Sequence, residues 1–161
     1  ANCGFCRIKS GSDFQLRPAE DIRQQLTGLM NLFAEERANI RGIFLGQNDA
    51  LAAGATAVAR TIRMILRHLD RPPRYVRDTM VFLFASCSSF LALTKAELDR
   101  LQELPCRLFI NLGLESFDQA SLEALRKPVR AADNRTALER MQAINRTAGP
   151  VTISANILLG D

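Results

Sequence analysis

The fold is decided by residues 79–112, TMVFLFASCSSFLALTKAELDRLQELPCRLFINL, in which two apolar runs flank a helical segment. The runs at 79–85 and 106–112 are almost continuously apolar and end in small or polar residues, which is the pattern of buried strands. Thr94 and Glu97 have the spacing of a capping box, so we expect a helix to begin there. A strand, a helix and a second strand in this order are typical of parallel strands joined by a helical crossover.

The same alternation extends to both sides of this stretch. Apolar runs at 40–45 and 151–159 predict two further strands. Helices are expected from about Pro18, over 55–69, over about 119–126 and over about 134–146. Apolar strands separated by helices predict an α/β fold, layered or barrel-like, with parallel strands. The chain starts on what reads as a loop and stops directly after a strand, so we expect an internal piece of a longer domain.

Composition narrows the possible partners. The 161 residues are 47% apolar and 24% charged, which is ordinary for a soluble single domain. A net charge of +4 favours anionic ligands, but aromatic residues make up only 6%, with no Trp, so platforms for stacking nucleic-acid bases are not expected. No apolar run reaches the length of a membrane span, and the start does not resemble a secretory signal. We therefore expect a cytoplasmic protein with no membrane or nucleic-acid partner.

The four cysteines divide into a close pair and two isolated residues. Cys3 and Cys6 lie three positions apart, whereas Cys87 and Cys106 lie at the end and the start of predicted strands. A disulfide scaffold fits a chain of this length and core poorly, so reduced thiols are expected. Cys87 and Cys106 are predicted to be buried, inert thiols. In a reducing compartment, the close pair indicates metal or redox chemistry.

Taken alone, the Cys3–Cys6 pair has several readings. It could be half of a zinc site, a thioredoxin-like redox pair or part of an iron–sulfur site. A redox pair should open a helix directly, but here a Gly/Ser-rich loop precedes the helix near Pro18. Zinc needs about four ligands, and the single histidine, His68, lies within a predicted helix. No second half-site is therefore visible.

Small and polar residues follow each predicted strand. In parallel α/β folds, ligands bind beyond the carboxyl ends of the strands, so these residues are candidates for a binding site. They are Gly46, Gln47, Asn48 and Asp49 after the first strand, Ser86, Cys87 and Ser88 after the second, Glu115 and Ser116 after the third, and Gly160 and Asp161 after the fourth.

Structural roles compete with these functional ones. Asp49 could simply cap the next helix, and Glu115 with Ser116 could merely start one. A basic run is expected to be mostly a solvated helix face, or else to dock an acidic partner domain. Its members are Arg60, Arg63, Arg67, Arg71, Arg74 and Arg77.

An ordered set of motifs resembles the radical S-adenosylmethionine (radical SAM) superfamily. The motifs are CGFC at 3–6, LGQNDAL at 45–51, FAS at 84–86, LGLES at 112–116 and ANILLG at 155–160. Their order and separations match, and the resemblance covers essentially the whole chain. It is greatest to the iron–sulfur oxidoreductases that include oxygen-independent coproporphyrinogen oxidases and elongator-type catalytic subunits. The resemblance implies a partial (βα) TIM-like barrel, with residues 1–161 forming strands two to five of a core domain truncated at both ends.

The resemblance also implies an activity. Three cysteines hold a [4Fe–4S] cluster whose open iron binds the amino and carboxylate groups of S-adenosylmethionine. One electron then cleaves the sulfonium to give a 5′-deoxyadenosyl radical, which abstracts hydrogen from a substrate that the sequence does not identify. A reductant such as flavodoxin or ferredoxin would supply the electron.

The cluster motif matches in part. Cys3, Phe5 and Cys6 correspond to the second cysteine, the aromatic residue and the third cysteine of the pattern, and Phe5 is expected beside the adenine. The first cysteine would fall two residues before Ala1. As given, the chain is therefore expected to hold a cluster poorly or not at all, and to be inactive.

The remaining positions carry over one at a time. Residues Gly46, Gln47, Asn48 and Asp49 resemble a glycine-acid turn that meets the methionine amino group, but only Asp49 keeps a carboxylate. Further contacts implied by the resemblance are Ser86, Glu115 and Ser116 to the ribose or methionine moiety, Lys127 to the carboxylate, and Asn156 beside the adenine. Two alternatives stay open: a cluster-free α/β scaffold or degenerate remnant, and a small zinc or redox thiol protein that uses Cys3 and Cys6.

Overall fold

Four parallel strands form one sheet in a computed structural model that describes residues 15–33, 35–36, 39–70 and 72–159. Each strand pairs with its neighbours along the chain, in the order β1-β2-β3-β4. The strands are β1 (Gly42–Phe44), β2 (Met80–Ser86), β3 (Arg107–Glu115) and β4 (Val151–Ile157). The predicted α/β fold with parallel strands is therefore confirmed.

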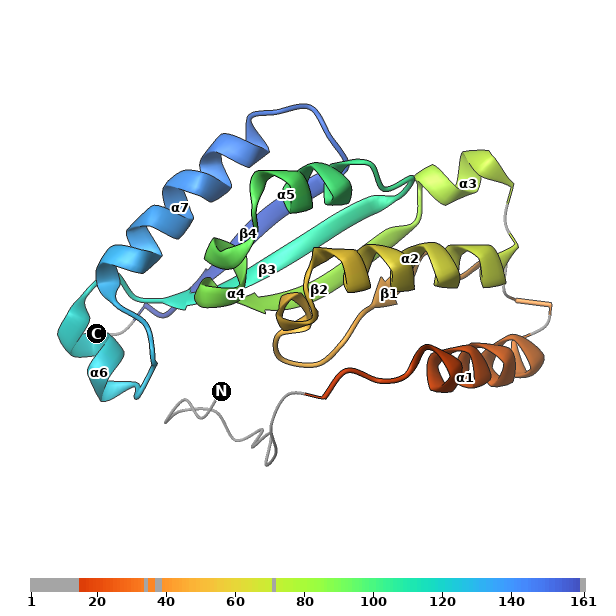
Figure 1. The fold of residues 1–161 in the computed structure, drawn as a ribbon, viewed down its shortest axis with the longest axis horizontal. Coiled ribbons are helices and arrows are strands. Elements are labelled where there is room, and N and C mark those ends of the chain that lie inside the picture. Colours follow the sequence, from red (N-terminus) through yellow and green to blue (C-terminus); the bar gives the residue numbers. More distant parts are fainter. Residues whose placement is uncertain (1–14, 34, 37–38, 71, 160–161) are drawn as a thin grey trace.

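Helices connect the strands and cover one face of the sheet (Figure 1). In chain order, the described helices are α1 (Ala19–Leu32), the short 3-10 helix η2 (Ala50–Ala53), α2 (Ala55–Leu69), α3 (Pro73–Arg77), α4 (Cys87–Ala92), α5 (Lys95–Gln102), α6 (Gln119–Ala124) and α7 (Ala131–Asn145). Of these, α1 precedes β1 and packs on α2. The predicted helix over 55–69 matches α2 residue for residue. Within the described ranges, no helix is both long and apolar enough to cross a membrane.

Local hydrogen bonds explain where several of these helices begin. Thr94 Oγ1 accepts a hydrogen bond from the Glu97 backbone N–H at 3.2 Å, and Glu97 Oε2 accepts one from the Thr94 N–H at 2.9 Å, so the predicted capping box opens α5. Ser86 Oγ accepts a hydrogen bond from the Ser89 N–H at 3.1 Å and caps α4, where the sequence predicted only a closing turn. Pro73 is the first residue of α3, a position that its fixed φ favours.

Alternate strand residues face the helices and form the core. On β2, Val81 and Leu83 are 0% and 1% exposed, while their neighbours point to the other side of the sheet. The core residues from the helices come mainly from α2, α4, α5 and α7, and include Ala55, Val58, Ile62, Phe90, Leu101, Ala137 and Ile144. The helix α1 packs on α2 through a smaller cluster of Leu26, Met64, Ile65 and Leu69.

The opposite face of the sheet is not covered by the described helices, and we call it the open face. Phe44, Phe82 and Phe84 are 55%, 36% and 40% exposed on it. The rings of Phe44 and Phe84 meet edge to face, and those of Phe82 and Phe109 stack, both at 5.1 Å between ring centroids. The strands read as continuously apolar because both faces carry apolar residues, although helices cover only one.

Candidate functional site

The open face changes from apolar to polar toward the carboxyl ends of the strands. The register places Phe44, Phe82, Phe109 and Thr152 in one row across the sheet, and Phe84, Asn111 and Ser154 in the next. The last row, which we call the carboxyl-end row, consists of Ser86, Gly113 and Asn156. Hydrogen-bonding groups therefore gather at the end of the sheet where parallel α/β folds bind ligands.

Asp49 ties the loop after β1 to the end of β2. Its Oδ1 accepts a hydrogen bond from the Ser86 N–H at 3.2 Å, and its Oδ2 accepts one from the Ser89 hydroxyl at 2.7 Å. Asp49 makes no side-chain cap to η2, so the simple capping role is wrong for the helix that follows it. The loop turns at Gly46, whose φ is +77° and where an added Cβ would lie 2.9 Å from the Ala50 Cβ. Gln47 and Asn48 are exposed in this loop.

Replacing Asp49 with alanine is expected to lower the free energy of unfolding by about 1.5–3 kcal/mol, because hydrogen bonds to a charged acceptor are lost. The Asp49→Asn variant keeps one acceptor oxygen and is expected to lose less. Urea unfolding followed by circular dichroism measures both. An Asp49→Ala variant as stable as the wild type would show that these contacts do not hold the loop.

Glu115 and Lys127 form an ion pair beside the carboxyl-end row. Lys127 Nζ lies 2.9 Å from Glu115 Oε1, and the two side chains are only 12% and 10% exposed. A Cβ added at Gly113 would lie 2.9 Å from Glu115 Oε1 and 3.0 Å from Lys127 Nζ, so a side chain at this point of the row would displace the ends of the pair. Glu115 itself has a φ of +68°, next to a register irregularity between β3 and β4.

Ser116 lies next to this pair but serves the following turn. Its hydroxyl accepts a hydrogen bond from the Asp118 N–H at 3.1 Å. Asp118 Oδ2 accepts one from the Ser121 N–H at 2.8 Å and caps α6. The interpretation that Glu115 and Ser116 start the next helix is therefore wrong, because Asp118 does so.

Asn134, which the sequence analysis missed, supports the backbone on either side of Glu115. It is 0% exposed, and its Nδ2 donates to the backbone oxygens of Leu114 and Ser116, both at 2.7 Å. A signal for its burial was available, because Asn134 shares one helical stripe with Ala137, Met141 and Ile144.

Asn111 is a second residue that the sequence analysis missed. Its Nδ2 donates to Ser154 Oγ at 2.9 Å and to Asn156 Oδ1 at 3.2 Å, which fixes the predicted site residue Asn156 against β3. The signal was an amide within an apolar strand, two positions before Gly113 and therefore on the same face. Asp49 with Ser86, Glu115 with Lys127, and Asn111 with Asn156 are thus three polar groupings at one end of the sheet.

The structure describes two of the four cysteines, Cys87 and Cys106. Cys87 and Cys106 are 2% and 1% exposed, so their predicted burial is confirmed. Burial raises the pKa of each thiol to about 11, and neither supplies a thiolate at neutral pH. Cys3, Cys6 and Phe5 lie outside the described residues. Among the described residues, no group of three or more His, Cys, Asp or Glu side chains is placed to hold a metal ion.

The raised thiol pKa values predict a loss of stability at alkaline pH. Burial disfavours the thiolate, so the folded-state pKa of about 11 lies above the ordinary value of 9.0. The stability that the protonated thiols contribute to the folded state is therefore complete below pH 9 and is lost as pH rises toward 11. Urea unfolding of the wild type and of a Cys87→Ala/Cys106→Ala variant across this range isolates the effect. The wild type should lose more stability than the variant, and equal losses would contradict the prediction.

Comparison with known proteins gives no match to a family model, to a curated protein or to a solved structure.

Proposed function

We propose that this chain is a radical SAM core in which β1 to β4 form part of a partial (βα) barrel and the open face is the barrel interior. The sequential strand order and the placement of the covering helices on one face support this arrangement. Doubly wound sheets, by contrast, carry helices on both faces.

One observation carries the proposal. Three residues that are expected to contact S-adenosylmethionine lie in the carboxyl-end row or next to it, and each comes from the end of a different strand. Ser86 and Asn156 belong to it. Glu115 joins them through its contact with Lys127 beside Gly113. Residues far apart in the sequence thus meet where a single ligand can reach them.

The charges suit the zwitterionic methionine end of this ligand. Glu115 would bind the amino group and Lys127 the carboxylate, so the ligand would replace one ion pair with two. Ser86 and Asn156 would supply hydrogen bonds to the ribose and adenine. Asp49 already accepts two hydrogen bonds, so its role is to hold the loop whose exposed Gln47 and Asn48 provide neutral contacts.

The donor chemistry of a [4Fe–4S] cluster is cysteine thiolate, which Cys3 and Cys6 would contribute. When bound, such a cluster supplies the single electron that cleaves the sulfonium. Cys87 and Cys106 do not fit this role, because both are buried and protonated at neutral pH.

The test is anaerobic reconstitution with iron and sulfide of the chain together with any coding sequence that precedes Ala1 in its gene. We expect a brown chromophore and, with S-adenosylmethionine and dithionite, 5′-deoxyadenosine detected by chromatography. A Cys3→Ala/Cys6→Ala variant should lose both, while a Cys87→Ala/Cys106→Ala variant should keep them. Absence of chromophore and product would reject the proposal in favour of a cluster-free scaffold. One equivalent of zinc lost from the Cys3→Ala/Cys6→Ala variant would favour the zinc alternative.

A further inference from the structure

A cationic cleft lies between α1 and α2, away from the open face. It has a volume of about 270 Å³. Its charged and titratable lining residues are Arg17, Arg23, Arg60, Arg67 and His68. Among the described residues that line it, none is acidic. The basic run, which the sequence predicts to be mostly a solvated helix face or else to dock an acidic partner domain, contributes Arg60 and Arg67 to this lining.

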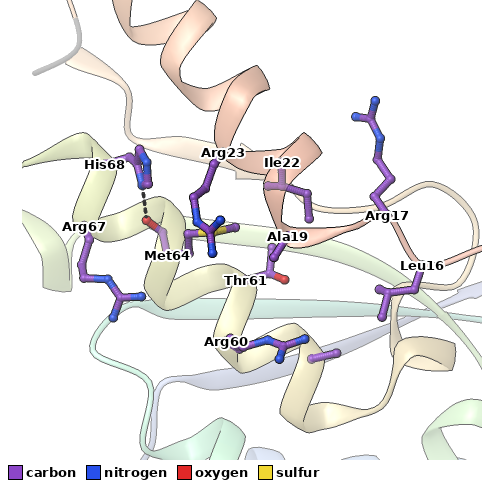
Figure 2. A pocket seen from close by; sticks show the side chains of 11 residues that line it. Leu16, Arg17, Ala19, Ile22, Arg23, Arg60, Thr61, Met64, Arg67 and His68 are labelled. Atoms are coloured by element: carbon purple, nitrogen blue, oxygen red, sulfur yellow. Dashed lines mark hydrogen bonds between the residues drawn. The ribbon is translucent and has the colours of Figure 1, made fainter.

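Helical spacing builds this cleft. Ala57, Arg60, Met64 and Arg67 recur every three or four residues on α2, so they share one side of the helix. Ala19, Ile22 and Arg23 line the facing side of α1. The cleft therefore has a small apolar floor with arginines around it (Figure 2).

The arginines differ in how far other groups neutralise them. Arg17 donates to Gln25 Oε1 at 2.7 Å and points away from α2 in Figure 2. Arg23 pairs with Glu20 of the same helix, and the Glu20 side chain is 63% exposed. Within the part of the chain that the structure describes, no ion pair uses Arg60 or Arg67. These two guanidinium groups keep their hydrogen-bonding capacity for a ligand.

We propose that this cleft binds a phosphate chain, such as a di- or triphosphate group. Guanidinium groups form bidentate hydrogen bonds with phosphate oxygens. Arg60 and Arg67 are seven residues apart, so their backbones are about 10 Å apart along the helix. Side chains of this length can both reach a phosphate chain that lies along α2, and Thr61 adds a hydroxyl to the lining.

The lining favours a phosphate chain over a nucleic-acid strand. No Phe, Tyr or Trp lines the cleft among the described residues, so bases would find no large aromatic platform there. The volume also suits a small ligand better than a polymer. This site is independent of the proposed radical SAM function, because it lies among the helices and shares no residue with the carboxyl-end row.

The experiment is isothermal titration calorimetry of the 161-residue chain with tripolyphosphate, pyrophosphate and phosphate in low salt. We expect saturable binding that weakens in the order given and with added sodium chloride. An Arg60→Gln/Arg67→Gln variant should weaken tripolyphosphate binding by at least about tenfold. ATP is expected to bind no more tightly than tripolyphosphate.

The matched control is Arg77→Gln/Arg146→Gln, which removes two exposed arginines outside the cleft and lowers the net charge equally. It should change the affinity by less than about twofold. The proposal is overturned if the Arg60→Gln/Arg67→Gln variant, shown to be folded by circular dichroism, binds like the wild type, or if the control loses as much. Absence of saturable wild-type binding would also overturn it, and much tighter binding of ATP would overturn the restriction to the phosphate chain.

Discussion

Replacing Asn134 with aspartate is expected to lower the free energy of unfolding by about 3–5 kcal/mol, or to prevent folding. The side chain is 0% exposed, and its Nδ2 donates to the backbone oxygens of Leu114 and Ser116. A carboxylate in the same place has no hydrogen to donate and repels both oxygens. Burial deprives it of water, so nothing offsets the charge.

Urea unfolding compares this variant with Gln142→Glu, which makes the same amide-to-acid change at an exposed position of the same helix. The control is expected to stay within about 0.5 kcal/mol of the wild type. If Asn134→Asp were no less stable than Gln142→Glu, the two hydrogen bonds would not hold the end of β3.

Replacing Lys127 with methionine is expected to cost about 2–4 kcal/mol, because it leaves the Glu115 carboxylate buried without its partner. Both side chains are at most 12% exposed, so water does not replace the lost contact. A Glu115→Gln/Lys127→Met double variant should be more stable than the sum of the single losses predicts, because neither charge is then left alone.

The control is Lys95→Met, which breaks the exposed ion pair with Asp99, where the side chains are 88% and 56% exposed. That change should cost no more than about 0.5 kcal/mol. Urea unfolding of the wild type, Lys127→Met, Glu115→Gln and the double variant gives the coupling energy, and Lys95→Met is measured beside them. Equal costs for Lys127→Met and Lys95→Met, or additive losses in the double variant, would contradict the burial argument.

The architecture was predictable because the periodicity of apolar residues and the spacing of capping residues reflect interactions between residues that are close in the sequence. The apolar runs and the capping box at Thr94 predicted the strand–helix–strand unit, and the segment 55–69, rich in Ala, Ile and Leu, predicted α2. The short helix α4 escaped prediction because Ser86, Cys87, Ser88 and Ser89 have the composition of a turn. Its start depends on the Ser86 cap and on Asp49 contacts 37 and 40 positions away, which no local pattern contains.

The candidate site was predictable only to the level of strand ends. Parallel strands bring their carboxyl ends together, so the positions of Ser86 and Asn156 followed from the pattern. The Glu115–Lys127 pair depends on the left-handed conformation of Glu115 and on the turn after α6, neither of which sequence periodicity reveals. Sequence patterns can mark Asn111 and Asn134 as amides at apolar positions, but their partners lie on other elements, so only the folded geometry identifies what they support.

The phenylalanine rings of the open face also bear on amide hydrogen exchange. β3 pairs with strands on both sides, and β2 pairs with β3 along its length and with β1 at Met80, Val81 and Phe82. Helices lie over one face of these strands and the rings of Phe82, Phe84 and Phe109 lie on the other. The amides of β2 and β3 should open to solvent only through the largest unfolding events of the chain. In deuterium exchange followed by mass spectrometry, we expect β2 and β3 to be the last segments to exchange, and the three-residue β1 to exchange before them.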